Sequence, residues 1–208
     1  DKGHKGINAL ILEKGMEGFE IGPKEQKMGI RGSDTHSLMF TDVRVPKENV
    51  VGEVGKGYKI AIETLNEGRI GIGAQMVGLA QGALDHTLGY VQEREQFGRP
   101  IANFQANAFK LADMAMEIEC ARLLLYKACW LRDNDMAFSK EAAMAKLYCS
   151  EVMYRCANHA VQLHGGYGLM KEYDVERFYR DQKLLEIGEG TSEVQRIVIS
   201  RYIGARCL

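Results

Sequence analysis

Three long helical segments dominate the sequence and restrict the fold. Apolar and small residues recur at helical spacing over residues 58–95, 103–132 and 139–163. Helices of about 25 to 35 residues span roughly 40 to 50 Å each at 1.5 Å per residue. Because short connections join them, they are expected to pack antiparallel, so the predicted fold is mainly α, a long-helix up-down bundle of four or five helices.

Residues that end or start helices set the predicted boundaries. Gly98-Arg99-Pro100 and Asp133-Asn134-Asp135 separate the long segments, and the first segment has room for an interruption at Gly68. Ser139 is predicted to cap the third helix, and Gly165-Gly166-Tyr167-Gly168 to end it. A shorter helix is expected over residues 175–185, capped by Asp174, and a last one over residues 192–205.

The second long segment carries one apolar stripe, which predicts its buried face. The stripe consists of Phe104, Ala108, Leu111, Ala115, Ile118, Ala121, Leu125 and Ala128.

The first 54 residues have a different pattern and are expected to form strands. The candidates are Ile7–Leu12, Ser37–Phe40 and Val43–Val45, separated by Gly, Pro, Asp and Ser. So few strands are not stable without a covering partner. We therefore expect residues 1–54 to be the end of a β-domain whose beginning is absent, and residues 55–208 to be a helical-bundle domain.

Composition excludes several classes of protein. The chain is 46% hydrophobic and 26% charged, with 27 basic and 28 acidic residues and a net charge of -1. This balance gives no basic footprint for nucleic acid or an anionic membrane. No apolar run approaches the ~20 residues of a membrane span. The five cysteines form no C-x-x-C pair, so we expect reduced core thiols and no metal site.

One carboxylate near the C-terminus has an unusual setting. Glu189 lies between Gly188 and Gly190, directly before Thr191 and Ser192, either of which can cap the last helix. The glycines allow positive φ or close approach of another group to the backbone. By itself this pattern fits a solvated surface turn as well as a functional carboxylate.

Six motifs in register resemble the acyl-CoA dehydrogenase family, most closely its short-chain, butyryl-CoA-like members. The resemblance extends over essentially the whole chain, and its motifs are Gly55-Lys56-Gly57-Tyr58, Leu65-Asn66-Glu67-Gly68-Arg69, Arg94-Glu95-Gln96-Phe97-Gly98, Gln162-Leu163-His164-Gly165-Gly166-Tyr167-Gly168, Arg180-Asp181 and Glu189-Gly190-Thr191-Ser192-Glu193-Val194-Gln195-Arg196.

The resemblance implies an activity and its partners. The family oxidises acyl-CoA thioesters between the α- and β-carbons with FAD, as in fatty-acid β-oxidation, and passes electrons to electron-transfer flavoprotein. Its subunits have three domains and assemble into dimers or tetramers, with FAD between domains and across a subunit interface. The chain matches only the C-terminal part of such a subunit. The resemblance implies location in a bacterial cytoplasm, which we prefer, or in a mitochondrial matrix.

The resemblance also assigns the base. Glu189 matches the catalytic carboxylate that removes the α-proton, and its backbone N–H matches the group that polarises the thioester carbonyl. Some family members carry the base on the residue before the arginine of the Leu65–Arg69 motif, which here is Gly68. Glu67 is expected to point away into solvent, because one helical step turns a side chain by about 100°.

Substrate contacts are implied for Tyr58, Asn66, Arg69 and Gly190. Two alternatives stay open from the residues themselves. Arg69 could pair with Glu63 or Glu67 along its helix, and Tyr58 could be an exposed aromatic residue at a domain junction.

Cofactor contacts are implied for eleven residues: Arg94, Phe97, Gln105, Gln162, Leu163, His164, Gly165, Gly166, Thr191, Ser192 and Glu193. Arg94 would bind the FAD diphosphate, and the Gln162–Gly166 stretch would lie against the FAD of a neighbouring subunit. The alternatives are one more charge in an exposed run and a plain glycine helix stop. Two other functions stay open, an acyl-CoA oxidase and a non-catalytic helical oligomerisation module.

Overall fold

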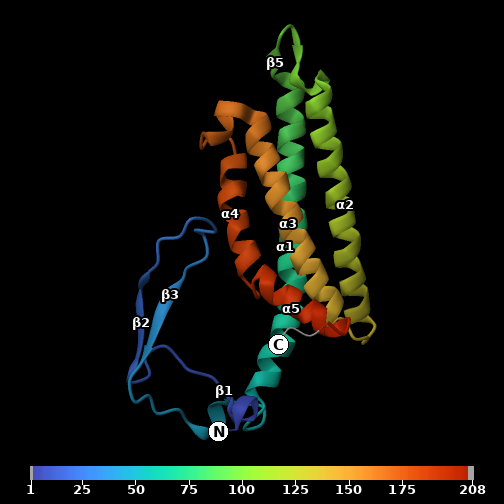
Figure 1. Ribbon diagram of the computed structural model, residues 1–208. Helices are drawn as coiled ribbons and strands as arrows, with labels where there is room; N and C mark the ends of the chain where they lie inside the picture. Colours follow the sequence, from blue (N-terminus) through green and yellow to red (C-terminus); the bar gives the residue numbers. More distant parts are fainter. Residues whose placement is uncertain (1, 206–208) are drawn as a thin grey trace. The chain divides into compact units, whose positions relative to one another are not determined.

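The computed structural model describes residues 2–205, and these divide into two compact units with the boundary between Leu65 and Asn66 (Figure 1). The first unit contains the strands β1 to β4 and the first residues of α1. The second unit contains the rest of α1 and the other helices. No described helix has the length and apolar character needed to cross a membrane.

Five helices form the predicted bundle, which is thereby confirmed. They are α1 (Gly57–Glu93), α2 (Gln105–Asp133), α3 (Ser139–His164), α4 (Val175–Ile187) and α5 (Ser192–Tyr202). Helix α1 continues through Gly68, so the interruption allowed for at that residue does not occur. A single glycine in a long helix costs only about 1 kcal/mol, which the packing of the flanking turns offsets.

Short elements connect the long helices. A two-stranded hairpin, β5 (Glu95–Gln96) with β6 (Arg99–Pro100), and a 3-10 turn at Ile101–Asn103 join α1 to α2. A 3-10 helix, η4 (Gly165–Leu169), follows α3 and takes the chain to α4. These connections are short, as antiparallel neighbours require.

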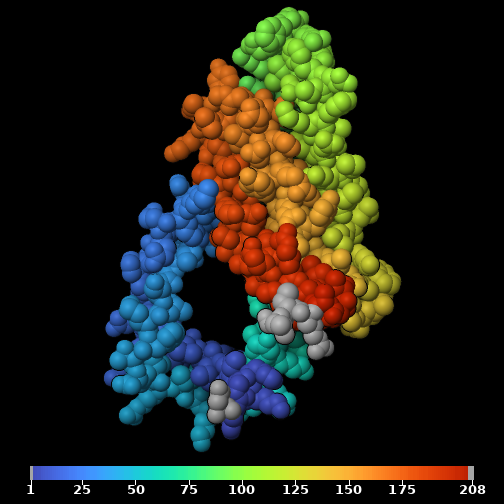
Figure 2. Space-filling view, in the orientation of Figure 1, coloured from blue at the N-terminus to red at the C-terminus, as the bar shows by residue number. Residues whose placement is uncertain are grey.

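Helix α3 is the centre of the second unit. It packs against α2, α4 and α5, and side chains fill the space between α2 and α3 (Figures 1 and 2). Alanines occupy much of its buried surface and let its neighbours approach closely. These are Ala142, Ala143, Ala145, Ala157 and Ala160.

Helix α2 buries one face and exposes an apolar one. Its buried residues are Leu111, Met114, Ile118, Ala121, Leu125, Ala128 and Leu131. The predicted stripe is thus correct at Leu111, Ile118, Ala121, Leu125 and Ala128. Ala108 and Ala115 are exposed, and the larger Met114 is buried in place of Ala115. On the opposite face Phe109, Met116, Leu123 and Trp130, spaced by seven residues, are each more than half exposed.

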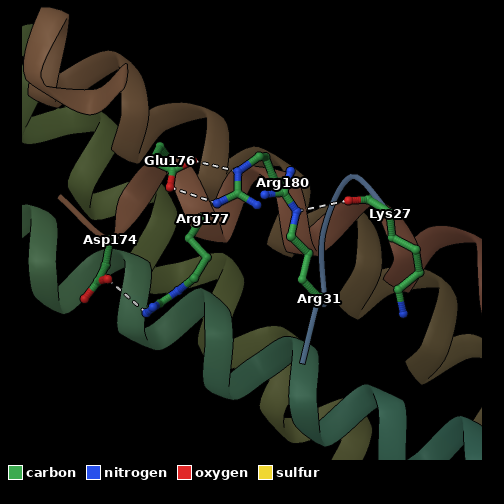
Figure 3. Close-up of polar contacts among 6 residues, drawn as sticks. All are labelled: Lys27, Arg31, Asp174, Glu176, Arg177 and Arg180. Carbon is green, nitrogen blue, oxygen red and sulfur yellow. Dashed lines mark hydrogen bonds and ion pairs between the residues drawn. The ribbon is translucent and has the colours of Figure 1, made fainter. Parts of the chain in front are cut away.

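Two predicted helix caps are wrong. Asp174 has helical backbone angles and makes no capping hydrogen bond. Its carboxylate instead pairs with Arg177 at 2.9 Å, beside the bidentate Glu176–Arg180 pair (Figure 3). Ser139 is the first residue of α3 rather than its cap, and its hydroxyl accepts from Asn66. Thr191 does cap α5, since its hydroxyl accepts from the Val194 N–H at 3.3 Å.

The first unit contains two short antiparallel pairs. Strand β1 (Ala9–Leu10) pairs with β4 (Val50–Val51), and β2 (Phe19–Lys24) pairs with β3 (His36–Phe40). The strand predicted at Val43–Val45 is absent, while β2 was missed because it contains Gly22 and Pro23. The irregular register between Ile21 and Lys24 accommodates these two residues. Within this unit Arg31 donates to the Lys27 carbonyl (Figure 3).

The cysteines differ in their surroundings. Cys149 and Cys156 are buried in α3, and burial raises the pKa of each thiol to about 12. Cys120 is exposed, so the prediction of a core thiol is wrong there. Cys207 lies outside the described residues.

Candidate active site

Glu189 occupies the turn between α4 and α5 with a backbone conformation that is unfavourable for a side-chain-bearing residue. Its φ is 55° and that of Gly190 is 92°. The left-handed region costs a non-glycine residue about 1–2 kcal/mol, so the surroundings must hold Glu189 there. The turn therefore stores strain at one carboxylate-bearing residue.

The Glu189 carboxylate lies directly against Gly68 of α1. A Cβ atom added to Gly68 would lie 2.5 Å from Glu189 Oε2 and 2.9 Å from its Cδ. No real Cβ contact is that short, so the absence of a side chain at Gly68 leaves the space that the carboxylate fills. Two positions 121 residues apart in sequence thus meet at one point.

Arg69 and Asn66 form a buried polar pair next to this point. Arg69 is 4% exposed, and its Nη1 donates to Asn66 Oδ1 at 2.7 Å, while Asn66 Nδ2 donates to the Ser139 hydroxyl at 2.9 Å. Burial lowers the pKa of Arg69, and the charge of Glu189 opposes that shift. The Nε of Arg69 has no hydrogen-bond partner among the described residues.

The alternative ion pairs of Arg69 are not formed. Glu63 pairs with Lys59 at 3.6 Å, and Glu67 pairs with Arg132 of α2 at 3.1 Å. The Glu67 side chain is 58% exposed, which confirms that it points away from the turn.

Two buried residues that sequence reasoning missed hold the turn from inside. Gln195 is fully buried, and its Nε2 donates to the carbonyl oxygens of Glu189 at 3.1 Å and Gly190 at 2.8 Å. Lys146 is also fully buried, and its Nζ donates to the carbonyl oxygen of Glu186 at 3.0 Å. Burial lowers the pKa of Lys146 to about 8. Lys146 was detectable, because it interrupts an apolar stripe of α3 that contains Ala142, Cys149 and Met153.

Other predicted residues form a pocket at a different place on the second unit. The pocket has a volume of about 380 Å³ and is lined by Tyr90, Arg94, Gln96, Ile101, Leu163, His164, Gly166, Tyr167 and Met170. His164 stacks on Tyr90 with ring centroids 4.2 Å apart, and its Nδ1 bonds the Ala160 carbonyl at 2.8 Å. Burial lowers the pKa of His164. Arg94 is exposed, with its guanidinium carbon 5.9 Å from the Tyr167 ring centre.

Three further cofactor candidates, Phe97, Gln105 and Gln162, and the substrate candidate Tyr58 are exposed. Phe97 forms the tip of the β5–β6 hairpin, 90% exposed with φ of 54°, and its ring meets Phe104 edge-on at 6.2 Å. Gln105 is the first residue of α2, and Gln162 is in the last turn of α3. Tyr58 belongs to the first unit, where it is 45% exposed and lies 5.6 Å from the His4 ring.

The predicted site residues of the second unit therefore fall into two groups. Asn66, Arg69, Glu189, Gly190 and the start of α5 (Thr191, Ser192 and Glu193) form one group, and the residues around the pocket form the other. About 25 residues of α1 lie between Gly68 and the pocket end of the helix, which corresponds to roughly 38 Å. A single chain does not bring the two groups together.

The buried lysine predicts a specific pH dependence of stability. Below pH 8 the folded protein carries a buried ammonium group, and between pH 8 and 10.5 the folded state loses this proton while the unfolded state keeps it. The free energy of unfolding of the wild type should thus rise across this window relative to Lys146→Met, which should be the more stable protein at pH 7. Urea unfolding at pH 7 and pH 9.5 measures this, with the exposed Lys127→Met as control for loss of one charge. A pH-independent difference between wild type and Lys146→Met would contradict the assignment.

Known proteins match this chain over nearly its whole length. Residues 55–204 match the family model described as acyl-CoA dehydrogenase, C-terminal domain. The short-chain specific acyl-CoA dehydrogenase of Clostridium acetobutylicum is 52% identical over 202 residues, covering 97% of this chain and 53% of that protein. The caffeyl-CoA reductase-Etf complex subunit CarC of Acetobacterium woodii is 52% identical over 199 residues, covering 96% of this chain and 52% of that protein.

A solved structure agrees with the fold. Butyryl-CoA dehydrogenase from Megasphaera elsdenii superposes with a TM-score of 0.94 at 50% identity, covering 97% of this chain and 53% of the other. The chain spans about half the length of the curated relatives it matches. On this evidence the chain belongs to the acyl-CoA dehydrogenase family and carries its C-terminal helical domain.

Proposed function

We propose that the complete protein is an FAD-dependent acyl-CoA dehydrogenase for short-chain acyl-CoA thioesters, with Glu189 as the base. Residues 1–54 are then the end of its middle β-domain. The observation that carries the proposal is the carboxylate of Glu189 in the space left by Gly68, beside the buried Arg69. The family's two base positions thereby converge on one place, and only Glu189 supplies a carboxylate there.

The residues of the turn divide the work of proton removal. Glu189 accepts the α-proton of the thioester, and its backbone N–H polarises the thioester carbonyl, which makes that proton more acidic. Asn66 and Arg69 orient the substrate, and the bare backbone of Gly190 allows the thioester to approach. FAD, when bound, supplies the acceptor for the hydride that leaves the β-carbon.

The pocket fits part of the cofactor. Its aromatic rings, Tyr90 and Tyr167, suit a planar group, and the exposed guanidinium of Arg94 suits a diphosphate. A Cβ added to Gly165 or Gly166 would meet nothing within 4 Å, so their backbone is open to a ligand. With Phe97, Gln105, Gln162, Leu163 and His164, these residues would hold the adenosine diphosphate half of FAD.

The distance between the two groups of residues favours cofactor sites that are each built from two subunits. Because about 38 Å of α1 separates Gly68 from the pocket, one chain contributes to two cofactor sites. Thr191, Ser192 and Glu193 serve the flavin next to the chain's own Glu189, and the pocket serves the FAD of a neighbouring subunit. The protein is then a homo-oligomer, and the exposed apolar face of α2 is the surface that a second copy covers.

The electron acceptor follows from a relative. The name of one relative places it in a complex with Etf, which supports electron-transfer flavoprotein as the partner of this protein. An oxidase would produce peroxide instead, so peroxide and carrier reduction measured together separate the two functions. A non-catalytic helical module would be purified without flavin absorbance. The compartment, bacterial cytoplasm or mitochondrial matrix, stays a prediction.

Replacing the base tests the proposal. Glu189→Gln in the full-length protein should slow flavin reduction by butyryl-CoA roughly 10²- to 10⁴-fold, because the amide cannot accept the α-proton. Anaerobic stopped-flow absorbance of the flavin measures this rate. Glu67→Gln, which changes the exposed carboxylate next to Gly68, should reduce flavin as the wild type does. Wild-type rates in Glu189→Gln would refute the assignment of the base.

Filling the space at Gly68 tests the geometry. Gly68→Ala should displace the carboxylate and slow flavin reduction by about tenfold or more. Stability should change by less than about 1 kcal/mol, because the contact is with the end of a flexible side chain. Gly78→Ala on the same helix meets no atom within 4 Å, so it should leave flavin reduction unchanged and raise helix stability by up to about 1 kcal/mol. Equal flavin reduction rates in the two variants would contradict the geometry.

The α2 face predicts the oligomeric state. Leu123, 61% exposed, is at the centre of the apolar row, so Leu123→Glu should shift the protein to smaller species in sedimentation velocity. Val54→Glu introduces the same charge at a residue that is 78% exposed outside α2, and should leave the assembly intact. If Leu123→Glu sediments as the wild type, α2 is not the self-association surface.

A further inference from the structure

The turn that carries Glu189 is tied to two different helices by buried side chains. We propose that Gln195 of α5 and Lys146 of α3 are positioning residues, which clamp the backbone on both sides of Glu189 and hold its carboxylate where it removes the substrate proton. The inference rests on the proposed function of Glu189. Neither residue was among those assigned from sequence.

The backbone conformation of Glu189 is one that contacts from neighbouring residues can stabilise. The left-handed region is energetically costly for a residue with a side chain, and hydrogen bonds to the adjoining backbone offset such a cost. Gln195 and Lys146 provide such hydrogen bonds on the two sides of Glu189. Gln195 bonds the carbonyl oxygens of Glu189 and Gly190, and Lys146 bonds the carbonyl oxygen of Glu186, three residues before Glu189.

Gln195 fixes the chain after the base. Its amide donates to the carbonyl oxygens of Glu189 and Gly190, which belong to consecutive peptide groups. A Cβ atom at Gly190 would lie 2.8 Å from Gln195 Nε2, so the side-chain amide rests on the bare face of this glycine. The absence of a side chain at Gly190 thus allows the Gln195 amide to reach both carbonyl oxygens.

Lys146 fixes the chain before the base. Its ammonium group bonds the carbonyl oxygen of Glu186, one of the last carbonyls of α4, which have no partner within the helix. A second carbonyl at this helix end is also bonded, because the N–H of Gly188 donates to the Leu184 carbonyl oxygen at 2.7 Å. Buried side chains thus bond the backbone at both ends of the turn. Gln195 bonds the end toward α5, and Lys146 bonds the end toward α4 and connects it to α3.

The cost of Lys146 indicates that its role is not stability. A fully buried ammonium group loses its hydration, and an apolar residue of similar length would pack in its place without that loss. The charges of Glu186 and Glu189 offset part of this cost by favouring the ammonium form. A structural residue would be expected to stabilise the fold, whereas a positioning residue here sacrifices stability for the geometry of the turn.

Gln182 offers a matched control. It is 2% exposed on α4, in the same unit as the turn, and it makes no described hydrogen bond to residues 186–190. Gln182→Met and Gln195→Met therefore make the same chemical change at equal burial, and only the second removes the clamp.

The experiment uses the full-length, FAD-loaded protein with butyryl-CoA. Gln195→Met and Lys146→Met should each lower the limiting rate of flavin reduction roughly 10- to 100-fold with little change in KM, because substrate binds but the base is displaced. Amide hydrogen exchange in peptides covering residues 186–190 should become faster in both variants and stay unchanged in α2. Gln182→Met should behave as the wild type in both measurements.

Two outcomes would overturn the proposal. One is that Gln195→Met and Lys146→Met both show the limiting rate of flavin reduction and the hydrogen-exchange pattern of Gln182→Met. The other is a loss of rate accompanied by faster exchange throughout the bundle, which would mean a general structural role. If Gln195→Met fails to fold, Lys146→Met decides alone, since removal of its buried charge favours folding.

A double variant separates this proposal from the function it rests on. If Gln195 acts only through Glu189, adding Gln195→Met to Glu189→Gln should cause no further loss of rate. If Glu189→Gln itself reduces flavin at the wild-type rate, the proposed base is wrong. Hydrogen exchange at residues 186–190 would then still show whether Gln195 and Lys146 clamp the turn.

Discussion

The contact between the Glu189 carboxylate and the bare backbone of Gly68 is the constraint on which the second unit depends. It requires a glycine in the middle of a long helix, a residue with positive φ in a turn, and a buried arginine beside both. Each of these features is unfavourable by itself. Together they place one carboxylate in a space that α1 leaves open.

The rest of the bundle supports this contact. Helix α3 packs against α2, α4 and α5, and it contributes the lysine that holds the end of α4. Helix α5 contributes the glutamine that holds the turn and the threonine-capped start that follows it. Four of the buried polar residues that the structure describes, Asn66, Arg69, Lys146 and Gln195, lie around this turn, whereas most of the other buried residues of α3 are apolar. This distribution matches a packed scaffold that holds one strained turn.

The helical part of the fold was predictable because helical periodicity is strong over long segments. Boundaries of α2 and α3 differ from the predicted ones by only one or two residues, as is usual at frayed helix ends. Side-chain details were less predictable, since the Ser139 hydroxyl accepts from Asn66, which is remote in sequence, rather than capping its own helix. Strand β2 was missed because a bulge makes Gly22 and Pro23 acceptable within it.

The candidate site was predictable in part. Sequence motifs indicated Glu189, Arg69 and several pocket residues as candidates. They did not indicate that Glu189 and Gly68 share one space, which the packing of the helices shows. Gln195 was part of a motif without a role of its own, because its contacts are with backbone atoms, which no side-chain pattern reveals. Lys146 interrupts an apolar stripe, a signal that a search for buried charges would have found.

Moving the carboxylate from one residue to the other tests the shared space most directly. In the full-length protein, the double variant Gly68→Glu with Glu189→Gly moves the carboxylate from the turn to position 68 of α1, next to the space that Glu189 filled. Convergence of the two positions predicts that the double variant reduces flavin with butyryl-CoA about tenfold or more faster than Glu189→Gly alone. A double variant no faster than Glu189→Gly would contradict it.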